Sequence, residues 1–358
     1  HSTFGPATDA SHRQGTPCAV SQRRPIAGGA DPAGFPDCVR RTTRYQEKGF
    51  PGFHHREQTS GYRSASGIHM LNTMRRAHCR LAAAFCLVLV LTGCASISGV
   101  TTSSLDGRNV EHIVAGHGAP AVVFENGLGG RLQWWAKVIP VVAQESTVFA
   151  YNRAGTGTST EASGPRDGNA ITEELRRNLR EKGIPPPYVL VGHSLGGLYM
   201  QFYARRYPED VAGLVLVDST HPEQLKGAGA KDNWPTWLKL MFDISLSSAA
   251  SKELEALAAT GAAMLALPPL IGKPVVVLSA QQPMSETSEL ARDANAKRSD
   301  IVHLHPCAKQ VWVDSGHAIP LEKPDAVIAT IHEVLHSVRA AKSLSSSTVS
   351  NENRQIQN

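Results

Sequence analysis

From residue 110 onward, short runs of apolar, β-branched residues alternate with longer segments of helical pattern. Most of the short runs are apolar throughout, which is typical of strands buried on both faces of a sheet. This alternation predicts the α/β class, with a mostly parallel sheet and helices on both faces. The predicted strands are residues 110–114, 121–125, 147–151, 188–192, 213–218, 274–279 and 310–314. The predicted helices are residues 134–142, 171–181, 195–207, 288–297 and 324–338.

Residues 219–273 interrupt the alternation, because they separate two predicted strands by more than a helical crossover needs. The insertion contains Trp234, Trp237 and Phe242, followed by a predicted helix at residues 252–265. We expect this apolar segment to form a small helical cap over a pocket at the carboxyl ends of the strands. The alternative is that it packs as additional core.

The basic charge of the chain belongs to its first 93 residues. They carry twelve Lys or Arg and five Asp or Glu, so residues 94–358 have a net charge of −2 although the whole chain has +5. A nucleic-acid-binding domain needs its basic residues clustered on the folded part. We therefore expect no nucleic-acid partner.

Residues 1–73 are rich in Gly, Pro, Ser, Thr and Arg and show no helical or strand periodicity. This composition predicts a disordered segment or, alternatively, sequence upstream of a true start at Met70 or Met74.

Residues 74–93 have the pattern of an export signal. Three arginines are followed by eleven apolar residues at 81–91, whereas a membrane-spanning helix needs about 20. The following Leu91-Thr92-Gly93-Cys94 resembles a bacterial lipobox, in which the cysteine becomes lipidated. We expect an exported protein anchored to a membrane of the cell envelope through Cys94, with residues 94–109 as a tether. An ordinary cleaved signal or a short membrane anchor is the alternative.

The domain itself is expected at residues 110–342. If the signal is removed and Cys94 carries lipid, Cys307 has no partner, and a domain of about 250 residues can be stable without a disulfide. The polar residues 343–358 predict a disordered tail.

The strongest chemical signal is Gly192-His193-Ser194-Leu195-Gly196, which lies between a predicted strand and a predicted helix. Glycines two residues either side of the serine let the strand and helix approach closely, so the turn presents the hydroxyl of Ser194 on a strained bend. We predict that Ser194 is a nucleophile. His193 is expected to point elsewhere and to have no catalytic role.

A serine hydroxyl needs a base that takes its proton during attack. His317 follows the last predicted strand in Asp314-Ser315-Gly316-His317 and precedes the last helix. A loop at this place can bring the imidazole over the serine, so we predict that His317 is the base.

An acyl-transfer intermediate also needs backbone N–H groups that bind its oxyanion. The residue after the nucleophile, Leu195, supplies one candidate. The glycine-rich loop Asn126-Gly127-Leu128-Gly129-Gly130, which follows a predicted strand, supplies the other through Leu128. This loop lacks the Gly-Lys-Ser/Thr end of a phosphate-binding loop, so no nucleotide cofactor is expected. No metal is expected either.

Residues 110–338 resemble the α/β-hydrolase superfamily. The serine turn, the loop Asn126-Gly127, residues 151–157 and Gly316-His317 occur in the order typical of that superfamily. Asn126 and Asn152 stand where members commonly have His and Asp, and we expect these departures to affect loop packing more than mechanism. The serine nucleophile argues against epoxide hydrolase and haloalkane dehalogenase chemistry, which use an aspartate there.

The acid that completes a Ser-His-acid triad is the least determined residue. The resemblance implies an acid after the next-to-last strand, but residues 280–285 contain no carboxylate. Asp218, at the end of the preceding strand, is a position that some lipases of the superfamily use, and we favour it. Glu286 is the main alternative, with Glu289 and Asp293 next, and a capping or turn role is the competing interpretation for Asp218.

These features predict a serine hydrolase that cleaves an apolar carboxylic ester through an acyl-enzyme intermediate. Hydrolysis of an amide, thioester or carbon–carbon bond is the alternative within this chemistry. A catalytically silent binding protein that keeps the fold is the alternative outside it.

Overall fold

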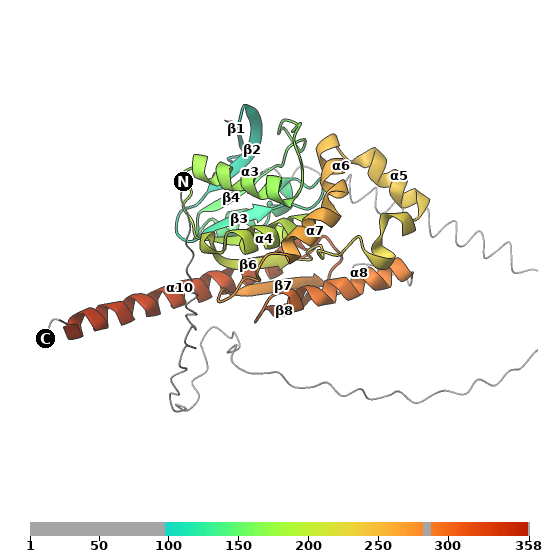
Figure 1. Cartoon of the computed structure of the whole chain (residues 1–358). Coiled ribbons are helices and arrows are strands. Elements are labelled where there is room, and N and C mark those ends of the chain that lie inside the picture. The colour runs from blue at the N-terminus through green and yellow to red at the C-terminus, as the bar shows by residue number, and fades with distance from the viewer. Residues whose placement is uncertain (1–96, 282–287, 357–358) are drawn as a thin grey trace, which may run out of the picture. The chain divides into compact units, whose positions relative to one another are not determined.

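The computed structural model describes residues 97–281 and 288–356, and the side chains of these residues up to 343. Its centre is an eight-stranded sheet with the strand order β1-β2-β4-β3-β5-β6-β7-β8 (Figure 1). Strands β1, β2 and β4 pair antiparallel, whereas every pairing from β4 to β8 is parallel. The predicted class, a mostly parallel α/β sheet covered by helices, is therefore confirmed.

Apolar, β-branched sequences form the strands because they fit a pleated surface that is buried on both sides. The strands are β1 Thr101–Leu105, β2 Arg108–Ala115, β3 Ala121–Glu125, β4 Val148–Tyr151, β5 Tyr188–His193, β6 Val211–Val217, β7 Val275–Ala280 and β8 Lys309–Val313. All residues of β3, β4, β5, β6 and β7 are buried.

Successive side chains of a strand point to opposite faces of the sheet, and the core is divided accordingly. Val122 and Phe124 of β3 pack in one apolar cluster with α2 and α10, whereas Ala121 and Val123 pack in another with α3 and α4. The helices outside the insertion are η1 Leu132–Trp135, α2 Ile139–Val142, α3 Gly168–Glu181, α4 Leu195–Arg206, η2 Pro208–Asp210, α8 Glu289–Asp300, η5 Ile301–Leu304, α9 Ile319–Glu322 and α10 Pro324–Ile356.

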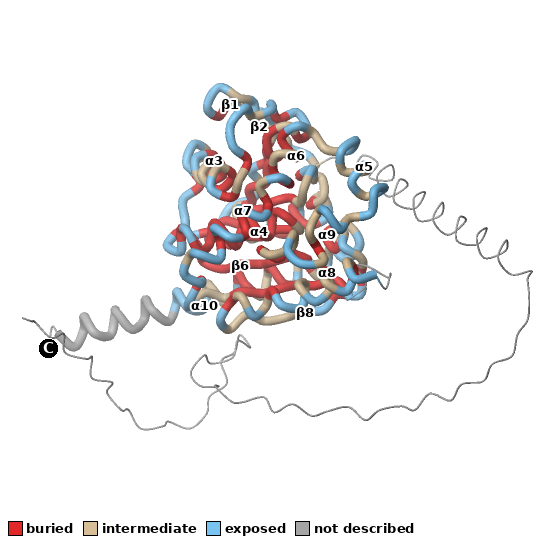
Figure 2. The backbone as a smooth tube through the Cα atoms, turned by 45° about the vertical axis from the view of Figure 1, so that its right-hand side comes forward, coloured by how far each residue is buried: buried red, intermediate tan, exposed pale blue. Residues whose placement is uncertain are grey.

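The insertion between β6 and β7 is helical. It contains η3 Gly227–Gly229, η4 Lys231–Asn233, α5 Thr236–Ser245, α6 Ser248–Glu255 and α7 Leu257–Leu265, so the single helix expected at residues 252–265 is two helices. No residue of α5 is buried, whereas α6 and α7 contribute Leu254, Leu257 and Met264 to a third apolar cluster (Figure 2).

The predicted tether at residues 94–109 is wrong from residue 101 onward, because β1 and the start of β2 form a hairpin there. Asp106 and Gly107 occupy the turn with φ angles of 50° and 75°. An Asp-Gly pair favours this kind of two-residue hairpin turn, since both positions require a positive φ.

The predicted disordered tail at residues 343–358 is also wrong for most of its length, because α10 continues to Ile356. The sequence after Pro324 contains no Gly or Pro in this helix. Nothing therefore breaks the propagation of a helix whose first turns are docked on the sheet.

The predicted segment 1–73, the signal at 74–93 and Cys94 lie outside the described residues. Cys307 is disulfide-bonded in this structure, which contradicts the expectation that it has no partner. That expectation assumed removal of the signal, whereas the structure is of the whole chain. None of the helices in the described parts combines the length and hydropathy that crossing a membrane requires.

Candidate active site

Ser194 lies on the turn between β5 and α4 with φ 53° and ψ −124°, a conformation that a serine adopts only under strain. The neighbouring glycines leave no space for a side chain. A Cβ atom on Gly192 would lie 2.6 Å from the carbonyl oxygen of Gly196, and one on Gly196 would lie 2.4 Å from the carbonyl oxygen of Asn126. The sequence therefore produces the tight turn that presents the Ser194 side chain at the carboxyl end of β5.

His317 comes to this serine from the loop after β8. Its Nε2 atom lies 3.0 Å from Oγ of Ser194. The loop is held by a hydrogen bond from the Gly316 amide to the carboxylate of Glu322, with a length of 2.8 Å. The His317 side chain remains 46% exposed, so a substrate or water can reach it.

Asp218 follows β6 and has its carboxylate beside His317, with 2.5 Å between Oδ2 of Asp218 and Nδ1 of His317. Its other oxygen accepts hydrogen bonds from Nε of Arg298 at 2.6 Å and from the Ala280 amide at 3.0 Å. Burial by itself would raise the pKa of this carboxyl, but the contact with His317 and the charge of Arg298 lower the pKa to about 2. The carboxylate is therefore charged at neutral pH.

Among the acids weighed from the sequence, the structure brings Asp218 to the histidine. Glu286 lies outside the described residues. Glu289 begins α8, and the Asp293 carboxylate pairs with Lys297 at 2.6 Å.

The two amides expected to bind an oxyanion flank Ser194. Leu195 is the first residue of α4, so its N–H has no acceptor within the helix. The loop containing Leu128 lies against the serine, since a Cβ atom on Gly127 would be 3.1 Å from Cβ of Ser194. The structure therefore places both predicted residues, Leu128 and Leu195, in segments next to Ser194.

His193 has a supporting position that the sequence did not predict. Its Nε2 donates to the carbonyl oxygen of His317 at 2.9 Å, and its ring centre lies 4.8 Å from that of His317 and 5.1 Å from that of Trp134. Burial, followed by the charge of His317, lowers the pKa of His193 to about 3, so the ring is neutral. The motif identifies His193 in the sequence but does not predict the orientation of its ring.

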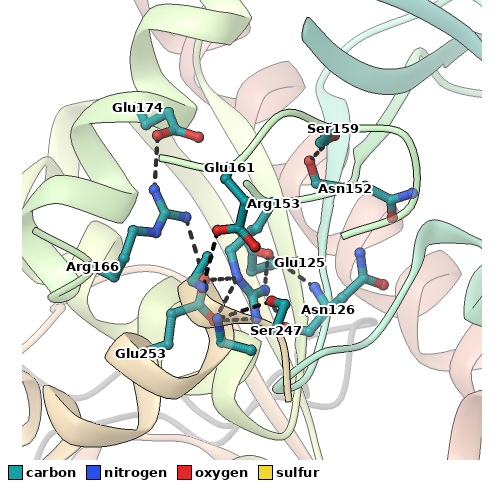
Figure 3. Close-up of polar contacts among 12 residues, drawn as sticks. Glu125, Asn126, Asn152, Arg153, Ser159, Glu161, Arg166, Glu174, Ser247 and Glu253 are labelled. Atoms are coloured by element: carbon teal, nitrogen blue, oxygen red, sulfur yellow. Dashed lines mark hydrogen bonds and ion pairs between the residues drawn. The ribbon is translucent and has the colours of Figure 1, made fainter. Parts of the chain in front are cut away.

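A second polar cluster lies beside the loop of residues 126–130, which we call the oxyanion loop (Figure 3). We call this cluster, formed by Arg153, Glu125, Glu253, Arg166 and Glu174, the Arg153 network. Nη1 of Arg153 donates to Oε1 of Glu125 and to the carbonyl oxygen of Asn126, each at 2.6 Å. Nη2 donates to the carbonyl oxygen of Gly127 at 2.7 Å and to Glu253 of α6 at 2.8 Å. Nε donates to Oε1 of Glu253 at 3.0 Å.

The Arg153 network continues to α3 through a second arginine. Nη2 of Arg166 lies 3.3 Å from Glu253, and its Nη1 lies 2.9 Å from Glu174 (Figure 3). Burial alone would lower the pKa of Arg153, but the charges of Glu253 and Glu125 raise it well above its ordinary value. Arg153 thus stays protonated inside the protein.

The two departures from the superfamily pattern are asparagines that bond to nearby loops. Nδ2 of Asn126 donates to the carbonyl oxygen of Tyr151 at 2.9 Å, and Oδ1 of Asn152 accepts from the Leu132 amide at 2.7 Å. Within residues 97–281 and 288–356 there is no group of three or more His, Cys, Asp or Glu side chains suited to a metal ion.

With this geometry established, comparison with known proteins identifies the fold. Residues 120–270 match the family model described as the alpha/beta hydrolase fold. A putative lipase from Acinetobacter baumannii AYE superposes with a TM-score of 0.52 at 22% identity, covering 68% of this chain and 93% of that one. A haloalkane dehalogenase loop variant from Bradyrhizobium elkanii gives 0.54 at 16% identity, covering 69% and 99%. The domain has the α/β-hydrolase fold, which confirms the resemblance predicted from its motifs.

Curated relatives are similar over shorter stretches. The (lyso)-N-acylphosphatidylethanolamine lipase of Mus musculus is 29% identical over 133 residues, which are 34% of this chain and 37% of that protein. A putative carbamate hydrolase of Escherichia coli O150:H5 (strain SE15) is 34% identical over 129 residues, or 32% and 48%. Matches to two uncharacterized Bacillus subtilis (strain 168) proteins span 39% and 41% of their length. The chain thus spans less than half the length of each of these curated relatives.

Proposed function

We propose that this protein is a serine hydrolase that cleaves carboxylic esters. The observation that carries the proposal is the chain of contacts at the turn after β5. Ser194 Oγ lies 3.0 Å from His317, and the other nitrogen of His317 lies 2.5 Å from Asp218. Serine, imidazole and carboxylate in this order form the arrangement that activates a hydroxyl for acyl transfer.

In the proposed reaction, Oγ of Ser194 forms a bond to the ester carbonyl carbon while Nε2 of His317 takes the hydroxyl proton. Asp218 stabilises the imidazolium that results, and the amides of Leu195 and Leu128 donate to the oxyanion. Collapse of this intermediate breaks the bond to the alcohol, which leaves with the proton from His317. Water, activated by the same imidazole, then attacks the acyl group and releases the acid and free Ser194.

The apolar surroundings of the oxyanion loop favour an ester with apolar groups. Leu128 packs against a buried apolar cluster that includes Leu198 from α4, and Trp234, Phe242 and Leu246 from the insertion pack against the same cluster. Such a surface favours hydrocarbon over charged substrates, because burying apolar area stabilises the complex. Cleavage of an amide, thioester or carbon–carbon bond would use the same three residues and is the second candidate.

The test is hydrolysis of a series of p-nitrophenyl esters from acetate to palmitate by the wild-type protein and Ser194→Ala. We expect activity that depends on chain length in the wild type and none above background in the variant. A folded wild-type protein that cleaves no ester would contradict the ester proposal. A fluorophosphonate probe then separates the alternatives, because labelling at Ser194 indicates another acyl bond and no labelling indicates a silent binding protein.

We also propose that the protein is exported and anchored to a cell-envelope membrane through lipid on Cys94. The sequence pattern at residues 74–94 supports this location. Mass spectrometry of the mature N-terminus tests it, and an intact peptide that spans Gly93 and Cys94 in the exported protein would contradict it.

A further inference from the structure

The guanidinium of Arg153 has no freedom to turn. An arginine carries five N–H donors in a rigid plane, and here each has an acceptor on Glu125, Asn126, Gly127 or Glu253. The Arg153 side chain is only 3% exposed, so water does not compete for these bonds. The two carbonyl oxygens that it binds are therefore held in fixed directions.

One of these carbonyl oxygens determines the direction of a proposed catalytic amide. The peptide bond between Gly127 and Leu128 is not among the cis bonds of the described residues. In a trans peptide the C=O and the following N–H point in opposite directions. Because the Gly127 oxygen faces Arg153, with a second bond from the Gly130 amide at 3.1 Å, the N–H of Leu128 must face away from the guanidinium.

The guanidinium is itself held from the insertion. Glu253 lies on α6 and binds Arg153 through both carboxylate oxygens, at 3.0 and 2.8 Å, with only 2% of its side chain exposed. The partner is 100 positions away in the sequence. Glu253, a residue of the insertion, thus holds Arg153 in place, and Arg153 in turn holds the loop beside Ser194.

We propose that Arg153 is a positioning residue for the oxyanion hole and that Glu253 makes the insertion part of that device. Arg153 orients the Gly127–Leu128 peptide so that the Leu128 N–H can donate to the developing oxyanion. Glu253 keeps the guanidinium in this orientation. The inference rests on the proposed ester hydrolysis, because it assigns a role to an amide of that reaction.

The test compares an ester with its thiono analogue, in which sulfur replaces the carbonyl oxygen. Sulfur is a weak hydrogen-bond acceptor, so the thiono reaction gains little from the amides of an oxyanion hole. Arg153→Lys keeps the charge but not the planar set of five donors. We expect kcat for the oxygen ester to fall by about 100-fold, as when one oxyanion donor is lost, with KM changed by less than about threefold. The thiono rate should change much less.

Arg166→Lys is the matched control. Arg166 is also buried and also pairs with Glu253, but its hydrogen bonds go to Glu253 and Glu174 rather than to the oxyanion loop. We expect this variant to lose some thermal stability and to keep the wild-type ratio of oxygen-ester to thiono-ester rates. Glu253→Gln, which keeps the shape of the side chain and loses its charge, should lower that ratio by less than Arg153→Lys does.

The outcomes separate this inference from the proposed function. If the wild type hydrolyses esters and Ser194→Ala does not, the proposed function stands. Circular dichroism shows whether the Arg153→Lys protein is folded. If it is folded and its oxygen-ester and thiono-ester rates fall equally, or both stay unchanged, the positioning role is overturned. The same selective loss in Arg166→Lys would overturn it too, since the effect would belong to the whole network. A wild type without esterase activity removes the proposed function and this inference together.

Discussion

Two regions near the carboxyl ends of the strands each contain an arginine bound to a buried carboxylate, yet they differ in access to water. In the candidate active site, Arg298 binds Asp218, and the adjoining His317 side chain is 46% exposed. In the Arg153 network, the side chains of Arg153, Glu125 and Glu253 are 3%, 0% and 2% exposed. Groups that exchange protons with a substrate must be reached from outside, whereas groups that hold a loop act best where water cannot replace them.

The difference also predicts what each region does for the protein. A charged side chain that is enclosed depends on its partners, because desolvation makes it costly when one partner is removed. Asp218 is equally buried, but it keeps bonds to His317 and to the Ala280 amide if Arg298 is removed. We therefore expect the active site to be sensitive in rate and the Arg153 network to be sensitive in stability.

The largest expected effect is on rate, at Asp218. Asp218→Asn removes the charge that stabilises the imidazolium and permits the wrong His317 tautomer, so kcat should fall by about 10⁴-fold. Asp210→Asn is the matched control. Asp210 lies directly before β6, whereas Asp218 lies directly after it, and Asp210 also pairs with an arginine, Arg176, at 2.7 Å. Ester kinetics of the two variants measure the difference. Equal losses of activity would mean that Asp218 acts through the stability of β6 rather than through His317.

The next effect is on stability, at the two arginines. Arg153→Ala leaves Glu125 buried without a cationic partner and leaves Glu253 only its contact with Arg166, so it should lower the free energy of unfolding by about 3–5 kcal/mol. Arg298→Ala should lower it by about 1–2 kcal/mol, because Asp218 keeps its bonds to His317 and to the Ala280 amide. Urea unfolding of both variants gives the two values. If Arg298→Ala were the more destabilising change, the contrast between an enclosed and an accessible region would not hold.

A smaller effect depends on pH and concerns His193, which is enclosed although it adjoins the active site. Its pKa is lowered from 6.5 to about 3, so between these values the unfolded chain binds a proton that the folded protein does not. Stability therefore falls as the pH drops from 6.5 toward 3. His193→Gln keeps a donor for the His317 carbonyl and removes this titration. The slope of unfolding free energy against pH between 4 and 6 should decrease by about 1.4 kcal/mol per pH unit.

Urea unfolding at several pH values measures that slope for the wild type and the variant. His305 also has a pKa lowered to about 4, chiefly by burial. It is present in both proteins, so its contribution to the slope is the same in each. An unchanged slope would show that His193 is accessible to protons in the folded state and belongs with the exposed region.

The smallest effect is expected on α5, the most exposed helix of the insertion. Trp237 and Ile244 are 63% and 76% exposed, so replacing either by serine removes little buried surface. The free energy of unfolding should change by less than about 0.5 kcal/mol. Thermal or urea unfolding checks this, with Leu254→Ser on the buried face of α6 as the destabilising control.

The sequence was sufficient where the signal is local. Strands such as β6 are apolar throughout, and the glycines around Ser194 specify their turn without reference to distant residues. The sequence also identifies His317 locally, because it lies in the loop between the last strand and the last helices. The Asp106-Gly107 pair between β1 and β2 is also a local signal, because it favours the hairpin turn found there.

The partners of these residues could not be derived in this way. Asp218 and Arg298 are 80 positions apart, and Arg153 and Glu253 are 100 apart. Such pairs form only when the sheet brings its loops together, and nothing in the local pattern of either residue indicates the other. The local pattern therefore favours Asp218 as the acid but leaves Glu286, Glu289 and Asp293 as alternatives, and it does not indicate the roles of Arg298 and of the Arg153 network.

The attachment of Glu253 to Arg153 limits how the insertion of this protein can be exchanged. Grafting the insertion of a homologue onto the sheet is an obvious way to change substrate preference, since the graft would replace the apolar side chains near Leu128. A graft without a carboxylate at the place of Glu253 would leave Arg153 with one acidic partner in a closed interior. Exchange libraries should therefore keep α6 in the host and vary α5, none of whose residues is buried.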